Sequence, residues 1–95
     1  MTTVAFDVDG TLIIAGDGPP VAREHIRQVM RVMRLMPDVR IVVWSGSGEL
    51  YAQQVCREIH VAHWVDFYWP KRAGQKVDIS FDDEDVQLAT VNVRV

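Results

Sequence analysis

Apolar residues along the chain fall into short runs that alternate with longer stretches in which apolar and polar positions recur at helical spacing. The run "TVAF" near the start is continuous rather than alternating, as expected for a central strand buried on both faces. The whole pattern predicts the order strand, helix, strand, helix, strand, strand, strand. Such an order is typical of βαβ units, so we expect an α/β fold with a mainly parallel sheet.

Turn and capping residues set the boundaries of these elements. The predicted strands cover residues 3–8, 39–44, 64–68, 77–81 and 89–95, the last of them at a sheet edge, and the predicted helices cover residues 20–36 and 49–60. Pro20 suits the first turn of the first helix, and Ser47 is the expected N-cap of the second.

Three of the predicted strands end in polar residues: Asp7 with Asp9, then Ser45, then Asp82 with Asp83. The carboxyl ends of parallel strands lie side by side, and ligands of open α/β sheets bind just outside those ends. We therefore expect these residues, which are far apart in the sequence, to converge on one crevice.

Carboxylates gathered at a dry strand end repel one another unless one is protonated or a cation lies among them. Mg²⁺ suits such a place because it prefers oxygen ligands, needs only one or two carboxylates and keeps positions open for water and phosphate. Lys71 or Lys76 can balance the remaining charge, and the Ser45 hydroxyl and the backbone N–H groups of "SGSG" can donate to the same anion. These parts predict in-line phosphoryl transfer to a carboxylate nucleophile, with a second carboxylate protonating the leaving oxygen.

The segments "FDVDGTL", "VVWSG", a loop lysine and "ISFDDED" resemble, in that order, motifs one to four of the haloacid dehalogenase-like (HAD) phosphatase superfamily. The resemblance spans nearly the whole chain. It implies a three-layer Rossmann-like (HAD-like) fold with a mainly parallel five-stranded sheet. It also implies a Mg²⁺-dependent phosphomonoester hydrolase that acts through an aspartyl-phosphate intermediate.

The resemblance gives each matching residue an expected role. Asp7 would be the nucleophile, and Asp9 would be the general acid and base that protonates the leaving group and then activates water. Mg²⁺ would be held by the Asp7 carboxylate, the Asp9 backbone carbonyl and an acid from Asp82 or Asp83. Ser45 would bind the phosphoryl group, and a lysine would neutralise it.

The chain departs from the usual pattern of this family between motifs two and four, where the segment is short. Lys71 is preferred as the phosphoryl-binding lysine, because Lys76 lies so close to the fourth predicted strand. The two usual positions for a cap insertion are nearly empty, since "LIIAGDGPP" is long enough only for a short flap and the run from Trp64 to Val77 leaves no room for a cap domain. The resemblance thus implies a minimal, capless (C0-type) member. Its open site would suit large or extended phosphorylated substrates, or would take its lid from another subunit of a homo-oligomer.

The composition limits the number of domains, the partners and the cellular location that we expect for this protein. The 95 residues are expected to form one domain, 1–95, and an apolar fraction of 48% with a charged fraction of 24% is ordinary for a soluble globular protein. The formal net charge of -3 gives no reason to expect duplex nucleic acid or an anionic membrane as a partner. No stretch resembles a signal peptide or a membrane span, so the sequence predicts a cytoplasmic protein.

Two other functions stay open at this point. A binding or assembly protein could keep the fold and the metal without useful turnover, because so short a chain has few parts to exclude water and select a substrate. The presence of Asp9 favours catalysis, since members of the HAD superfamily that are not phosphatases often replace the acid at that position. A 3′-phosphatase acting on nucleic-acid ends fits the open site but not the net acidity.

Overall fold

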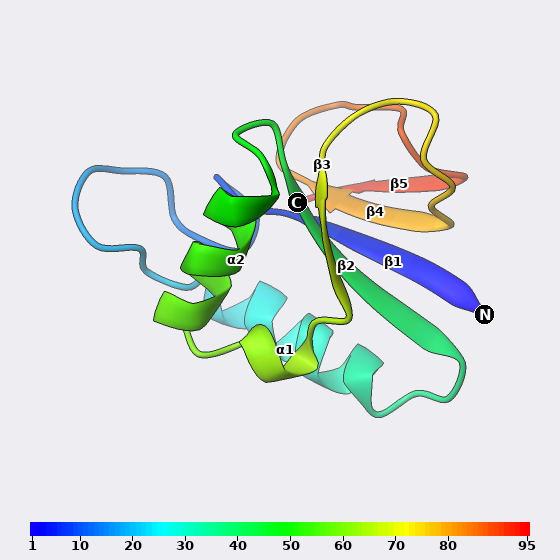
Figure 1. The fold of residues 1–95 in the computed structure, drawn as a ribbon, viewed down its shortest axis with the longest axis horizontal. Helices are drawn as coiled ribbons and strands as arrows, with labels where there is room; N and C mark the ends of the chain where they lie inside the picture. The colour runs from blue at the N-terminus through cyan, green and yellow to red at the C-terminus, as the bar shows by residue number, and fades with distance from the viewer.

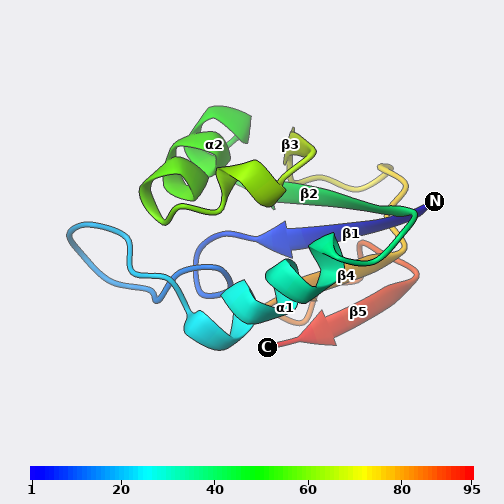
Figure 2. The same ribbon diagram turned by 90° about the horizontal axis from the view of Figure 1, so that it is seen from below.

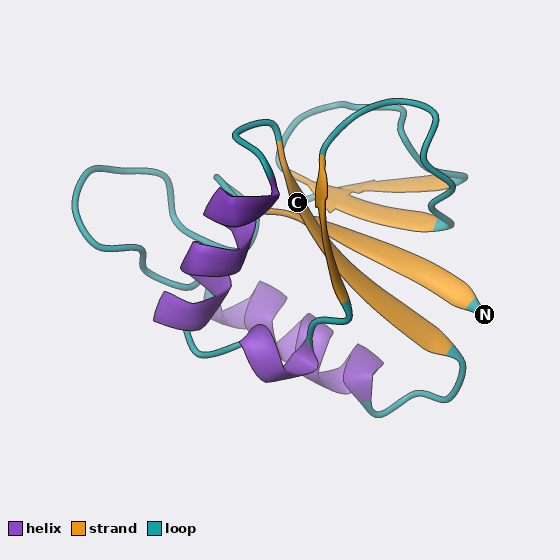
Figure 3. Ribbon diagram, viewed as in Figure 1, coloured by secondary structure: helices purple, strands orange, loops and turns teal.

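The computed structural model describes all 95 residues and contains five β-strands, two α-helices and one 3₁₀ turn (Figures 1 and 3). In chain order they are β1 (Thr2–Asp7), α1 (Glu24–Arg34), β2 (Val39–Ser45), α2 (Glu49–Glu58), the 3₁₀ turn η1 (Ala62–Trp64), β3 (Phe67–Pro70), β4 (Ile79–Asp82) and β5 (Val91–Arg94). The predicted order of strands and helices is confirmed.

The strands form one sheet in the order β3-β2-β1-β4-β5, and every neighbouring pair is parallel. β1 lies at the centre, where its Phe6 is opposite Val43 of β2 and Phe81 of β4. Burial on both faces accounts for the continuous apolar run in β1. The predicted parallel α/β architecture is therefore confirmed, and β5 lies at a sheet edge as expected.

Both helices pack on the same face of the sheet (Figures 1 and 2). Alternate side chains of β1 and β2 meet the inner faces of α1 and α2 in a core that includes Val4, Phe6, Ile26, Met30, Ile41, Val43, Val55 and Cys56. Burial of each large apolar side chain stabilises the fold by roughly 1.5–3 kcal/mol. This core fixes the helices against the sheet and so fixes the start of α2 relative to the strand ends.

The opposite face of the sheet is covered by two loops of eight residues each, 71–78 and 83–90. Beneath them a second, smaller core joins Trp44 of β2 to Val77 and Leu88. The third layer of helices, expected from the family resemblance, is not confirmed. Because crossovers between parallel strands are right-handed, the direction in which the chain moves along the sheet decides which face a connection covers. The connections from β1 to β2 and from β2 to β3 run in one direction and cover one face, whereas those from β3 to β4 and from β4 to β5 run in the other direction and cover the opposite face. Eight residues that must also cross between strands leave no room for a helix.

The first helix begins at Glu24 rather than at Pro20, and this difference has a local cause. Before the helix the chain folds back on itself, because the Ile14 N–H donates to the Val21 carbonyl at 2.9 Å and a bridge pairs the residues on either side. These bonds hold residues 13–21 as a narrow loop, called the flap below, which is the blue loop at the left of Figure 1.

The other boundaries differ from the prediction by smaller amounts. β3 begins at Phe67 because the chain first makes the 3₁₀ turn η1. α2 ends at Glu58, and His60 adopts a left-handed conformation with φ 62° that stops the helix. Gly48, not Ser47, is the N-cap of α2, and no side chain caps that end. The remaining strand ends lie within two residues of their predicted positions.

Candidate functional site

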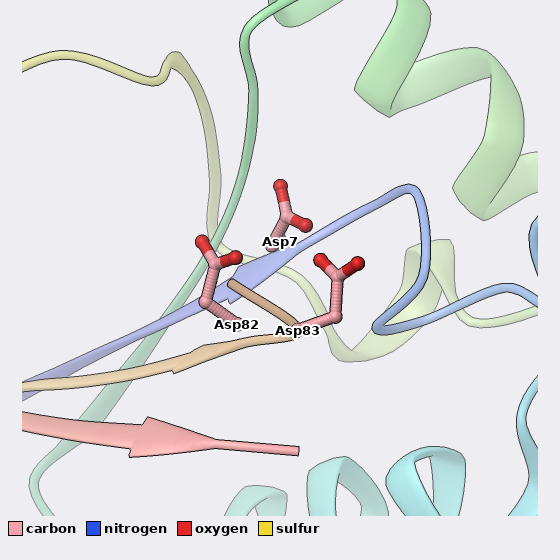
Figure 4. A group of neighbouring side chains, drawn as sticks. All are labelled: Asp7, Asp82 and Asp83. Carbon is pink, nitrogen blue, oxygen red and sulfur yellow. The ribbon is translucent and has the colours of Figure 1, made fainter. Parts of the chain in front are cut away.

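Three aspartates gather at the carboxyl edge of the sheet (Figure 4). Asp7 is the last residue of β1, Asp82 is the last residue of β4, and Asp83 follows it. Each offers one oxygen, and these atoms all lie within 4.8 Å of one another. Because the strand order reverses between β1 and β4, the group lies at the switch point where open α/β sheets bind ligands. The expected convergence is therefore present for these three acids.

Lys71 brings a positive charge into this group. It directly follows β3, and its backbone N–H donates to the Ser45 carbonyl at 3.0 Å, which anchors the start of the loop. Its Nζ lies 3.2 Å from Asp7 Oδ1 and 2.5 Å from Asp82 Oδ2. Lys76, by contrast, is exposed and forms no ion pair. Of the two lysines considered from the sequence, Lys71 is the one that the fold brings to the aspartates.

Asp7 is only 7% exposed. The Thr11 hydroxyl donates to its Oδ2 at 3.4 Å, and Lys71 contacts its Oδ1. Burial and the neighbouring charge of Asp82 raise the pKa of Asp7 to about 7, although Lys71 opposes the shift. Carboxyl groups whose pKa is shifted by burial together with a specific neighbouring charge are concentrated at functional sites.

Asp82 is 2% exposed and is held from two sides. Its Oδ1 accepts from the Glu84 N–H at 3.0 Å, while the contact with Lys71 is the only polar contact of its Oδ2. Burial opposes the charge on Lys71, but hydrogen bonds and charges from Asp82 and Asp7 outweigh it and raise the pKa of Lys71 above its usual value. The lysine therefore stays charged, and the group keeps an excess of negative charge.

Asp9 does not join the other acids. It lies in the turn after β1, is exposed, and its Oδ1 accepts from the Tyr51 hydroxyl of α2 at 2.7 Å. That hydrogen bond is the largest cause that raises the pKa of Tyr51 to about 12. Asp9 is not among the three acids whose oxygens lie within 4.8 Å of one another, since its carboxylate bonds to α2, and its convergence on the same crevice stays a prediction.

Ser45 ends β2 next to β1 and is 3% exposed. Its Oγ accepts from the Ser47 N–H at 3.0 Å, which leaves the hydroxyl hydrogen free to donate. α2 begins only a few residues later, and the first N–H groups of a helix have no partner within it. The fold thus places neutral donors at the same edge of the sheet as the three aspartates.

Gly10, Thr11 and Tyr51 have no role predicted from the sequence, although the structure places all three at the site. Thr11 is fully buried against Asp7, and Gly10 approaches Asp83 where a side chain would collide. Arg23 donates through Nη1 to the Gly10 carbonyl at 2.6 Å, which ties this turn to the start of α1. The sequence signal that could have identified Gly10 and Thr11 is the Gly-Thr pair itself, which directly follows the acids at the end of the strand.

The fold and the site together define an α/β protein with an open parallel sheet and a cluster of three aspartates and one lysine at its switch point. Comparisons of the chain with models of protein families, with curated proteins and with solved structures find no match. No helix in the structure has the length and apolar character needed to cross a bilayer. A functional assignment therefore rests on the motifs and on the geometry of the site.

Proposed function

We propose that the protein is a Mg²⁺-dependent phosphomonoester hydrolase of the HAD type, acting through an aspartyl phosphate formed on Asp7. The observation that carries this proposal is the position of the Lys71 ammonium, 3.2 Å from Asp7 and 2.5 Å from Asp82 at the switch point of the sheet. A phosphoryl group bound beside Asp7 would meet a carboxylate nucleophile, a fixed cation and further acidic ligands. The order of the four motifs supports the same assignment.

The residues present fit a hard divalent cation. Above pH 7, where Asp7 is mostly ionised, three aspartates and one protonated lysine give a net charge of two negatives, and Asp82 Oδ2 is buried with no polar contact except Lys71. Asp7, Asp82 and Asp83 would hold the ion, since Mg²⁺ prefers carboxylate oxygens. When bound, it supplies Lewis-acid polarisation of the phosphoryl oxygens.

The proposed reaction has two halves. In the first, an Asp7 oxygen attacks phosphorus, the bond from phosphorus to the leaving oxygen breaks, and Asp9 gives that oxygen a proton. Lys71 and the Ser45 hydroxyl contact the phosphoryl oxygens and stabilise their charge. In the second, water attacks phosphorus, Asp9 takes the proton from the water, and inorganic phosphate leaves with Asp7 restored as a carboxylate.

A binding or assembly protein with little turnover is the second candidate, and one observation favours it. The Asp9 carboxylate is hydrogen-bonded to Tyr51 at 2.7 Å and lies outside the group formed by the other acids. In such a protein Asp7, Asp82 and Asp83 would hold a cation or a charged partner without an effective general acid. The two candidates differ in turnover, not in metal binding.

The decisive experiment measures phosphate release from 4-nitrophenyl phosphate, phosphorylated metabolites, nucleotides and phosphorylated oligonucleotide ends, with and without Mg²⁺. We expect turnover that requires Mg²⁺ and that disappears in Asp7→Asn. Preferential cleavage of a 3′-phosphate from oligonucleotides would identify a nucleic-acid end phosphatase. Mg²⁺ binding with no turnover on any substrate would overturn the phosphatase and leave the binding protein.

A further inference from the structure

A cleft of about 330 Å³ lies between the flap and α2. Figure 1 shows the two segments side by side, with the flap as the blue loop and α2 in green. The polar residues of its lining are Asp9, Asp17, Tyr51, Gln54 and Glu58, and the rest is apolar or glycine. No lysine, arginine or histidine lines it, so the cleft presents three carboxylates and no positive charge.

The cleft has a definite direction. Tyr51, Val55 and Glu58 follow one face of α2 at helical spacing. Tyr51 marks the end nearest the proposed general acid, because its hydroxyl donates to Asp9 Oδ1 at 2.7 Å. Glu58 lies seven residues further on, which is about 10 Å along the helix axis. The cleft therefore runs from the proposed acid, past an apolar middle, to a second carboxylate.

We infer that this cleft holds the leaving group of the substrate, and that the leaving group is an aliphatic alcohol carrying a positive charge. The inference rests on the proposed function, since it takes Asp9 as the acid that protonates the leaving oxygen. When the bond from phosphorus to oxygen breaks, that oxygen gains the proton of Asp9 and the free alcohol leaves from the cleft.

Charge and chain length both favour this class of leaving group. An ammonium at the far end meets Glu58, whereas a carboxylate or a second phosphate there is repelled by the acids of the lining. Methylene groups in between displace water from Val55 and from the apolar part of the flap. A six-carbon chain spans most of the distance from Tyr51 to Glu58.

The test uses three phosphate esters of equal length: 6-aminohexyl phosphate, hexyl phosphate and 5-carboxypentyl phosphate. Phosphate release is followed at saturating Mg²⁺ and pH 8, where the amine is protonated. We expect kcat/KM to fall about tenfold from the amine to the neutral ester and about tenfold again to the carboxylate. Acetyl phosphate is too small to reach the cleft, so its rate of hydrolysis measures the chemical step without a contribution from the cleft. Equal values for the three esters would overturn the inference, while hydrolysis of acetyl phosphate would leave the phosphatase standing.

Two variants on α2 distinguish the effect of a carboxylate inside the cleft from the effect of the overall negative charge of the protein. Glu58→Gln should reduce the preference for the amine at least threefold. Glu49→Gln removes a carboxylate from the same helix outside the cleft and should leave the preference intact. An unchanged preference in Glu58→Gln, or an equal loss in both variants, would overturn the inference.

Binding of the product alcohol tests the cleft even if no ester is hydrolysed. Amide resonances of the flap and of α2 are followed by NMR during titration with 6-amino-1-hexanol, 1-hexanol and 6-hydroxyhexanoate. Shifts confined to these segments, largest for the amine and lost in Glu58→Gln, would support the cleft as a site for a cationic alcohol although the phosphatase had failed. Absence of shifts with the amine would overturn it.

Discussion

The α-carbon of Gly10 faces the carboxylate of Asp83 so closely that a β-carbon at this position would overlap the carboxylate atoms. Gly10 also has φ +80°, a conformation that favours glycine. The turn after β1 and the loop after β4 therefore fit together only with glycine at position 10. This fit holds Asp83 beside Asp7 in the group of three acids.

Replacement of Gly10 by alanine should displace Asp83 and weaken Mg²⁺ binding. The left-handed backbone alone costs roughly 1 kcal/mol, and the collision with Asp83 adds to it. Gly18→Ala is the matched control, because Gly18 has φ +91° and nothing within 4 Å of the added carbon. Thermal melts with and without Mg²⁺ compare the two. An equal loss of stability and an unchanged Mg²⁺ response in both variants would show that the contact with Asp83 has no effect.

Asp7→Asn keeps the shape of the side chain but removes the attacking carboxylate. Turnover should fall by roughly three orders of magnitude or more, with the fold intact by circular dichroism. Asp38→Asn is the control, since Asp38 is exposed at the opposite end of the sheet, just before β2. Retention of most activity in Asp7→Asn with 4-nitrophenyl phosphate would contradict the mechanism.

Without a metal, Asp7 should make the fold less stable as the pH rises. Its pKa is about 7 in the folded chain against an ordinary value of 3.8, so the folded state binds more protons between these values. The contribution of Asp7 to the free energy of unfolding is therefore fully present below pH 4 and is lost as the pH rises through 7. The loss amounts to roughly 2–4 kcal/mol.

Urea melts in EDTA at pH 4.5, 6 and 8 measure this effect. The informative quantity is the difference in unfolding free energy between the wild-type chain and Asp7→Asn, because the other titrating groups are common to both. As the pH rises, the unfolding free energy of Asp7→Asn should increase relative to that of the wild-type chain. A difference that is constant with pH would mean that Asp7 is not perturbed in the folded state.

The sequence predicted the parts of the site that depend on strand order, because parallel strands bring their carboxyl ends to one edge. Asp7 and Asp82 are last residues of paired strands, so an apolar run followed by an acid was enough to place them together. The side chain of Asp9 could not be placed in the same way. Its direction depends on the turn after β1 and on Tyr51, which lies in another element.

The missing helical layer has a similar explanation. Apolar periodicity reports which residues are buried, but not whether a helix or a loop buries them. Trp44 is fully buried, yet Val77 and Leu88 reach it from loops. The first helix was predicted too long because Pro20 is compatible both with a first helical turn and with the extended end of the flap.

Lys71→Ala should lower turnover far more than Lys76→Ala. Loss of Lys71 removes the cation that lies 3.2 Å from Asp7 and leaves Asp82 Oδ2 buried without its one polar contact. We expect a fall of about two to three orders of magnitude in kcat/KM for Lys71→Ala and less than about threefold for Lys76→Ala. Steady-state assays at saturating Mg²⁺ check both. The reverse order would transfer the role to Lys76.

Mg²⁺ should stabilise the folded chain, because binding to the native state alone adds RT ln(1 + [L]/Kd) to the free energy of unfolding. At a hundredfold excess over Kd this is about 2.7 kcal/mol, and each kcal/mol raises the melting temperature of a domain of this size by roughly 4–8 °C. EDTA should reverse the shift. Asp83→Asn should raise the metal-free melting temperature, by relieving repulsion with Asp7, and should abolish the response to Mg²⁺.

Asp85→Asn is the control for this last experiment, since Asp85 is exposed and is not among the three aspartates that could hold a metal. It should keep the Mg²⁺ response of the wild-type chain. The two effects expected of Asp83→Asn come from one cause, because an acid that repels its neighbours in the metal-free protein is the acid that a cation draws in. A variant that keeps the Mg²⁺ response and melts at the wild-type temperature would remove Asp83 from the metal site.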